Sequence, residues 1–363
     1  MPTLLHVLTR KNEPVDATRV NRGGNTTIVS PVWVDGWTRW ADFNHATLTQ
    51  IFHAELASPY VGGRAATPLP KNRVLYNERS LEDFLRMYLA PVVNGALHTQ
   101  DTAPHYGHGA RCLDAEEADW SVVSDRFVAH GGVYVNLVPG DTKVSAKWRS
   151  SMLREAGDHS QEWAKAVGQV LAYMARAGSR YGFIVTDKEL VALRLTRAPI
   201  GDGIARERPR RVVVPPPPSS PHAHAHARQP SDVTMTSGSS FSDANPIDWA
   251  WRDPEYAAVP WDAHGERQLT VKLALWCLAM MASRGGNGLD YAYPPLDSWR
   301  RGVGARGVGY YHNTSDTYKR ALDRDDILTT TEDDVEPADD EVARALEREA
   351  GVPRGGDLPA FSR

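Results

Sequence analysis

The sequence has few cysteines, no strong excess of charge of one sign and no long uninterrupted hydrophobic run. Only two cysteines, Cys112 and Cys277, occur among 363 residues. Two thiols so far apart argue against a disulfide framework and against a cysteine-ligated zinc site. The formal net charge of −4 excludes bulk positive charge as a means of binding polyanions, although a local basic groove is compatible with it. We expect a reducing, intracellular location, cytoplasmic or nuclear.

Membrane and secretion signals are also missing from the sequence. The longest apolar run, LTVKLALWCLAMMA over 269–282, is interrupted by Lys272 and falls short of the ~20 residues that a bilayer span requires. It predicts a buried helix. The first residues, MPTLLHVLTRKNEP, have neither the basic region nor the small-residue cleavage site of a signal peptide. We therefore expect no signal peptide and no membrane partner.

Composition divides the chain into regions of different character. Residues 1–73 show no sustained period and predict a loosely structured N-terminal extension, with one helix near HATLTQIFHAEL. Residues 74–282 predict a folded domain, interrupted over 198–246 by a Pro/Ser/His-rich insertion. We expect the insertion to be disordered, because its few apolar side chains cannot offset the entropy of ordering. Residues 283–363 predict a flexible acidic tail.

Within 74–282 the apolar residues alternate between the helical and the strand period. Ser80 and Asp83 form a candidate capping box, and Gly178 is placed to end a later helix. Gly131-Gly132 separates two strands that we expect to pair as a hairpin. The predicted elements are a helix over 80–94, strands over 120–130 and 133–148, a helix over 161–178, a strand pair over 181–196, a strand over 256–261 and a helix over 269–282. This order predicts an α/β fold.

Candidate catalytic residues lie in the predicted hairpin and in the helix after it. Asp141 and Lys143 are two apart in a strand, so both side chains point to the same side. Asp119 begins the preceding strand, and if the two strands are neighbours the two carboxylates converge. Mg²⁺ (or Mn²⁺) prefers such oxygen ligands. Gln169 and Tyr173 are four apart on the helix and share one face.

This set of residue types is sufficient for phosphodiester hydrolysis. A divalent cation held by two carboxylates stabilises charge that develops on the phosphate and lowers the pKa of a bound water. A nearby ammonium can orient that water or neutralise the oxyanion. The sequence therefore predicts a metal-dependent hydrolase of phosphodiester bonds.

The order of these elements and residues resembles that of the PD-(D/E)XK nuclease superfamily over 74–282. In general sequence character the chain is most similar to uncharacterised fungal members. Asp119 in EADW resembles the PD aspartate, and Asp141 with Lys143 in GDTK resembles the (D/E)-x-K pair. Gln169 and Tyr173 resemble the Q-x-x-x-Y pattern. The resemblance implies a restriction-endonuclease-like mixed central sheet flanked by helices, and a nucleic-acid substrate, DNA in preference to RNA.

The resemblance also implies roles for individual residues. Asp119, Asp141 and Glu82 become the metal ligands, and Lys143 positions the attacking water. The sequence departs from the family pattern at Ala118, which stands where proline is usual. The helix acid is Glu82 or, as an alternative, Glu78.

Other interpretations of the same residues remain open. Asp141 and Lys143 alone could be an ion pair in a turn, Asp125 could replace Asp119 as ligand, and Glu82 could simply stabilise a helix N-terminus. The fold could also have lost catalysis and bind nucleic acid or, through disordered tails, a protein.

Three further patterns do not predict function. HAHAH, from His222 to His226, lies in the Pro/Ser-rich insertion and offers no rigid metal site. GVGARG over 302–307 follows no predicted strand, so we assign it to the flexible tail and not to a dinucleotide loop. Cys277 lies inside an apolar helix and is expected to be a core residue.

Overall fold

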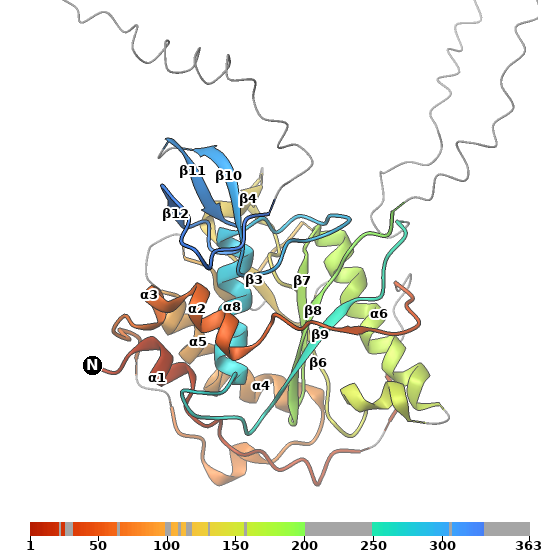
Figure 1. Cartoon of the computed structure of the whole chain (residues 1–363). Coiled ribbons are helices and arrows are strands. Elements are labelled where there is room, and N and C mark those ends of the chain that lie inside the picture. The colour runs from red at the N-terminus through yellow and green to blue at the C-terminus, as the bar shows by residue number, and fades with distance from the viewer. Residues whose placement is uncertain are drawn as a thin grey trace, which may run out of the picture.

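A five-stranded mixed sheet forms the centre of the molecule (Figure 1). The structure is a computed structural model, and it describes residues 1–329 apart from 22, 26–31, 64–65, 99–102, 108–109, 114–117, 130, 156–157, 200–248 and 305–306. The strands run in the order β1-β9-β8-β7-β6. The outer pairs β6–β7 and β9–β1 are parallel, while β7–β8 and β8–β9 are antiparallel. The strands are β1 (Thr38–Arg39), β6 (Gly140–Thr142), β7 (Tyr181–Val185), β8 (Glu189–Arg194) and β9 (Glu255–Pro260).

Both faces of the sheet are buried because its strands carry apolar residues at successive positions. On β7, Phe183 and Val185 enter one hydrophobic cluster and Ile184 enters another. On β8, Leu190 joins the first cluster and Val191 the second. This is the alternation expected of a strand. A sheet buried on both faces needs a cover on each side.

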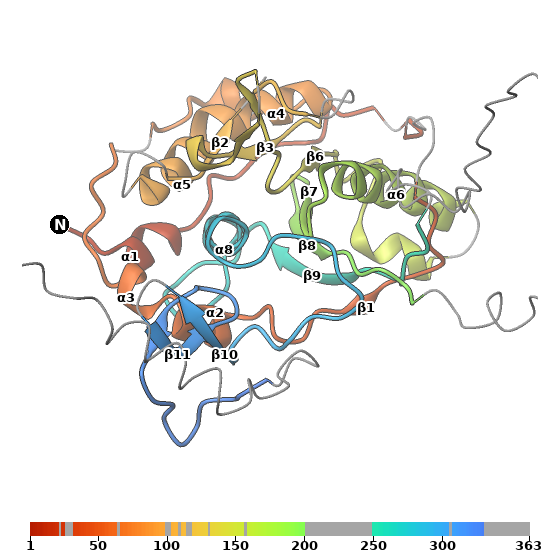
Figure 2. The same cartoon turned by 90° about the horizontal axis from the view of Figure 1, so that it is seen from above.

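Two long helices supply those covers from opposite sides (Figure 2). One is α6 (His159–Ala177), which follows β6 in the chain, and the other is α8 (Val271–Arg284). Helix α6 presents Trp163, Val167 and Val170 to the sheet, as its periodicity predicts. It ends at Gly178, whose positive φ of 64° suits glycine. The predicted α/β class, with helices on a mixed sheet, is confirmed.

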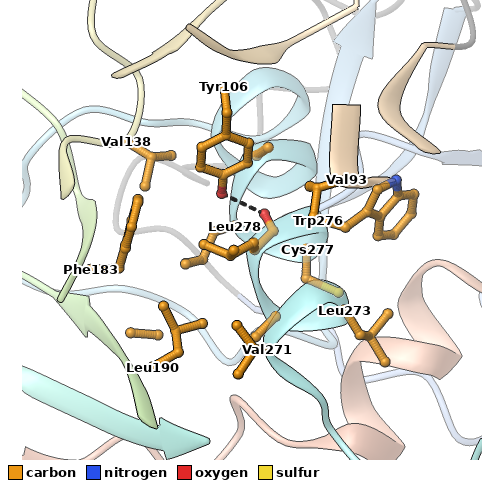
Figure 3. Packing of buried hydrophobic residues seen from close by; sticks show 14 of the residues in the cluster. Val93, Tyr106, Val138, Phe183, Leu190, Val271, Leu273, Trp276, Cys277 and Leu278 are labelled. Carbon is orange, nitrogen blue, oxygen red and sulfur yellow. Dashed lines mark hydrogen bonds between the residues drawn. The ribbon is translucent and has the colours of Figure 1, made fainter. Parts of the chain in front are cut away.

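Helix α8 lies at the centre of the larger cluster (Figure 3). Cys277 is fully buried, as predicted, and burial raises the pKa of its thiol. The hydroxyl of Tyr106 donates a hydrogen bond of 2.8 Å to the Leu275 carbonyl. Figure 3 shows Phe183 and Leu190 of the sheet facing this helix. No helix among the described residues is both long and apolar enough to cross a membrane.

The N-terminal region is more ordered than its composition predicts. Leu8, Leu48 and Phe52 are fully buried in the α8 cluster, and Thr38–Arg39 adds a strand to the sheet. The prediction of a loose extension over 1–73 is therefore wrong for most of its described residues. Its helices are too short to show a period, and long-range packing stabilises them. They are α1 (Leu4–Leu8), α2 (His45–Ile51), α3 (His53–Leu56) and the short 3₁₀ helix η1 (Pro70–Arg73).

The first predicted helix is divided in two. Helix α4 (Glu78–Tyr88) is capped by Asn77, with Ser80 in the reciprocal capping position. Pro91 occupies the first turn of α5 (Ala90–Leu97), where its missing N–H costs no hydrogen bond. The capping box therefore begins three residues earlier than predicted.

The predicted hairpin exists, but its strands are interrupted. Trp120 and Gly140 exchange two backbone hydrogen bonds of 3.1 Å, and Leu137 N–H donates to the Val122 carbonyl at 2.8 Å. Gly131 and Gly132 have positive φ values of 83° and 73° at the turn. Short elements replace the two long strands: β2 (His105–Gly107), β3 (Ser121–Val123), η2 (Asp125–Phe127), β4 (Val128–Ala129), β5 (Val133–Tyr134) and, after β6, η3 (Ser150–Arg154).

The predicted flexible tail begins with a folded part. The strands β10 (Trp299–Gly304), β11 (Gly307–His312) and β12 (Tyr318–Lys319) form a small antiparallel sheet near the end of α8 (Figure 1). The prediction of a flexible tail is therefore wrong for these residues. The described residues of GVGARG, 302–304 and 307, belong to the paired strands β10 and β11 and not to a flexible tail.

Other parts of these predictions lie outside the described residues. They are most of the insertion expected over 198–246, with HAHAH inside it, and the tail from 330 onward. The division into domains at 73 and 282 stays a prediction. Described residues from the N-terminal segment and from the segment after α8 belong to the same hydrophobic core as the central sheet, although composition suggested separate regions.

The close approach of β6 to β7 requires glycine at position 140. A Cβ on Gly140 would overlap the Phe183 ring. We expect Gly140→Ala to lower the free energy of unfolding by about 1–3 kcal/mol, the usual cost of overpacking a core. Denaturant unfolding measures this, with Gly288→Ala as control, since a Cβ there meets no atom within 4 Å. Equal losses in both variants would contradict this account of β6.

Candidate functional site

The pairing of Trp120 with Gly140 brings Asp119 beside strand β6. The backbone N–H of Thr142 donates a hydrogen bond of 2.9 Å to Asp119 Oδ2. The Trp120 indole N–H donates to Thr142 Oγ1 at 2.8 Å. Asp119 is thus held against the strand that carries Asp141 by a backbone contact and by the side chain of its neighbour.

Asp141 and Lys143 project to the same side and form a buried ion pair. Lys143 Nζ lies 2.5 Å from Asp141 Oδ2. Asp141 is 2% exposed and Lys143 is 7% exposed. The alternative of a solvent-facing turn pair is therefore wrong: the pair is at the sheet, inside the fold.

Burial and the second carboxylate set the protonation of Asp141. Burial raises the pKa of Asp141 to about 8; the Lys143 ammonium opposes this rise, and the charge and hydrogen bonding of Asp119 add to it. Burial alone would lower the pKa of Lys143, but the acidic groups of Asp141, Glu78 and Asp119 together outweigh burial and raise it. The two carboxylates therefore interact directly, as the sequence predicted.

Helix α6 places its polar pair at the edge of this site. Gln169 Nε2 donates a hydrogen bond of 2.7 Å to the Tyr173 hydroxyl. Burial raises the pKa of Tyr173, and the charges of Asp141 and Asp119 raise it further, so its hydroxyl lies within their field. Gln169 Oε1 is buried and accepts no hydrogen bond from the part of the chain that the structure describes. The pair thus includes one acceptor oxygen that is free of hydrogen bonds within those residues.

The predicted third metal ligand, Glu82 on helix α4, has a different partner in the structure. Glu82 forms a close ion pair with Arg86, one turn later on the same helix. No group of three or more His, Cys, Asp or Glu that could hold a metal gathers within the described ranges. The predicted three-acid cluster with Glu82 is therefore not present there. The alternative acid, Glu78, lies close enough to raise the pKa of Lys143 and contacts Lys147 at 3.6 Å.

Arg86 is a residue that the sequence analysis missed. Its guanidinium lies 5.9 Å from the centre of the Trp120 ring, and the charge of Asp119 acts on its pKa. Burial is the larger effect and lowers that pKa. The sequence did contain a signal for this residue: Arg86 lies four residues after Glu82 on a predicted helix, which is the spacing of an ion pair.

Asp125 does not compete with Asp119 for the site. It is exposed at the start of η2, and the Tyr134 hydroxyl donates a hydrogen bond of 2.9 Å to its Oδ1. Of the two aspartates, Asp119 is the one that lies against β6.

The donor set fits a hard divalent cation. Two carboxylates, Asp119 and Asp141, act on the single ammonium of Lys143, so these three groups include one more acid than base. Mg²⁺ is commonly held by one or two carboxylates together with water and substrate phosphate. Asp119 and Asp141 would supply those carboxylates.

Comparisons with protein-family models, with curated proteins and with solved structures find no match for this chain. The assignment of function therefore depends on the geometry of the site and on the resemblance in its motifs.

The hydrogen bond from Thr142 gives Asp119 a structural role that can be separated from its charge. Asp119→Ala leaves the Thr142 N–H unpaired, whereas Asp119→Asn keeps an oxygen acceptor and removes the same charge. We expect the alanine variant to be less stable than the asparagine variant by about 1–3 kcal/mol, the cost of an unsatisfied buried donor. Urea unfolding of both variants measures the difference, and equal stabilities would show that this hydrogen bond does not hold Asp119.

Proposed function

We propose that the chain is a nuclease-like, divalent-metal-dependent protein of the PD-(D/E)XK type, with a restriction-endonuclease-like fold, that hydrolyses phosphodiester bonds of nucleic acid. The observation that carries this proposal is the meeting of Asp119, Asp141 and Lys143 at one buried point, reached from two separate segments. The order of α4, the Asp119 segment, β6, α6 and the β7–β8 pair supports it, because this is the element order of the superfamily that the motifs resemble.

Each residue of the site has a definable role in this proposal. Asp119 and Asp141 hold Mg²⁺ or Mn²⁺, and the bound cation would lower the pKa of a water and stabilise charge on the phosphate. The Lys143 ammonium has three N–H donors and forms an ion pair with Asp141. Its other donors can orient the attacking water or stabilise the phosphorane oxygen. Gln169 and Tyr173 fix the polar edge of the site through their mutual hydrogen bond.

A second candidate function is a catalytically inactive module of the same fold that binds nucleic acid or a protein. The observation that favours it is the burial of Asp141 and Lys143, at 2% and 7% exposed. A scissile phosphate must reach these groups, and their cover would have to open first. Asp119 is only partly buried and is the accessible member of the site.

Cleavage assays test the first candidate. We expect the protein to cut duplex DNA with Mg²⁺ or Mn²⁺ and not with EDTA, with RNA and single-stranded DNA as parallel substrates. Asp119→Asn and Lys143→Met should each lower the rate at least about a hundredfold, because each removes charge stabilisation at the reacting phosphate. Asp125→Asn and Lys188→Met are matched controls at exposed positions. Equal activity in the site variants and the controls would defeat the assignment.

Metal binding separates the two candidates. Calorimetric titration with Mn²⁺ should show a site in the unmodified protein that is at least about tenfold weaker in Asp119→Asn, since one carboxylate ligand is lost. Asp125→Asn should bind as the unmodified protein does. A folded protein that binds no Mn²⁺ would favour the inactive module and reject the metal-dependent nuclease.

A further inference from the structure

A cavity of about 620 Å³ lies between α1, α4 and the start of α8. Its volume is within the range of small-molecule binding sites, roughly 300–1,000 Å³. None of Asp119, Asp141 and Lys143 is among its lining residues, so it is separate from the candidate nuclease site. Part of its wall is apolar, formed by side chains that include Val7, Phe84, Tyr88 and Trp261.

Lys272 brings a buried ammonium to this cavity. It lies in the first turn of α8 and is 6% exposed. Its Nζ donates to Asn12 Oδ1 at 2.9 Å and lies 3.4 Å from the Lys11 carbonyl oxygen. Asn12 is held in turn, because its Nδ2 donates to the Trp261 carbonyl at 2.9 Å. The ammonium is therefore fixed in place by neutral acceptors.

No carboxylate within the described part of the chain forms an ion pair with Lys272. Arg10 and Lys11 line the same cavity and add positive charge. Glu13 also lines it, but its carboxylate pairs with Arg73 at 2.7 Å. The cavity thus has an excess of positive charge at one wall and apolar side chains at another.

The lowered pKa of Lys272 is the behaviour expected of a buried ammonium that has no anion as its partner. Burial lowers the pKa of Lys272 to about 8; the charge of Arg10 lowers it further, and that of Glu13 opposes this. The amine is still mainly protonated at neutral pH. A buried charge without a counter-ion is costly, and a ligand that brings the opposite charge offsets that cost.

We propose that this cavity binds a small amphipathic carboxylate, with the carboxylate on Lys272 and the apolar body against Phe84, Tyr88 and Trp261. The apolar wall excludes a small inorganic anion as the preferred ligand, because such an ion would leave that wall in contact with water. The unpaired ammonium excludes a cationic ligand. Arg10 and Lys11 stabilise the same negative head at longer range.

A ligand series on the unmodified protein tests the proposal without any variant. The probes are decanoate, decanol and decyltrimethylammonium, which share an apolar chain and differ in head-group charge, each used below its micelle concentration. We expect calorimetry to show decanoate binding at least about tenfold more tightly than decanol, a difference of about 1.4 kcal/mol, and no binding of the cation. Equal binding of decanoate and decanol, or no binding of decanoate, overturns the proposal.

Variants test the role of Lys272 itself. Lys272→Met, which keeps the length and removes the charge, should weaken decanoate binding at least about tenfold and leave decanol binding unchanged. Lys272→Arg should retain most of the affinity, and Lys188→Met is a matched control at an exposed lysine that does not line the cavity. Circular dichroism checks that each variant is folded. Unchanged decanoate affinity in a folded Lys272→Met variant overturns the assignment.

The pH dependence of binding provides a separate measurement. The charged residues that line the cavity with Lys272 are Arg10, Lys11, Glu13 and Met1, which carries the terminal amine. Burial lowers the pKa of Lys272 to about 8. Deprotonation of Lys272 removes the partner of the carboxylate, so decanoate affinity should fall as pH rises from 7 to above 9. The Lys272→Met variant should show no such fall. A flat profile in the unmodified protein contradicts the proposal.

Discussion

The antiparallel pairing of Trp120 with Gly140 determines where the candidate site lies. Its two backbone hydrogen bonds of 3.1 Å place Asp119 against β6, the strand that carries Asp141 two residues before Lys143. The same residue, Gly140, packs against β7, where the Phe183 ring occupies the space that a side chain at position 140 would need. The packing of the sheet and the geometry of the site are therefore one constraint.

Burial gives the site its chemistry and also its energetic cost. Two carboxylates and one ammonium meet where little water reaches, so Asp141 binds a proton more tightly than an exposed aspartate does. Such a group gains from any cation that can replace the proton. The buried ammonium of Lys272 shows the opposite case: a positive charge, held by neutral acceptors, that gains from an anion. Both places store electrostatic free energy that a ligand can release.

Local patterns predicted the elements that carry the site, and long-range pairing decided their arrangement. The period of two places Asp141 and Lys143 on one side, and the helical period does the same for Gln169 and Tyr173, so both relations were predictable. Glu78 and Glu82 share one helix face, and spacing alone could not distinguish them. In the folded protein Glu82 pairs with Arg86 of its own helix, whereas Glu78 lies close enough to Lys143 to raise the pKa of that lysine.

By itself the sequence determined the α/β class, the main helices α6 and α8, the β7–β8 pair and the residue types at the site, because each depends on contacts within a few residues along the chain. Only the tertiary structure decided that residues from 1–73 and 299–319 belong to the folded body and that Lys272 reaches a cavity. These features depend on the burial of short, irregular segments against distant ones, and such contacts leave no periodic signal in the sequence.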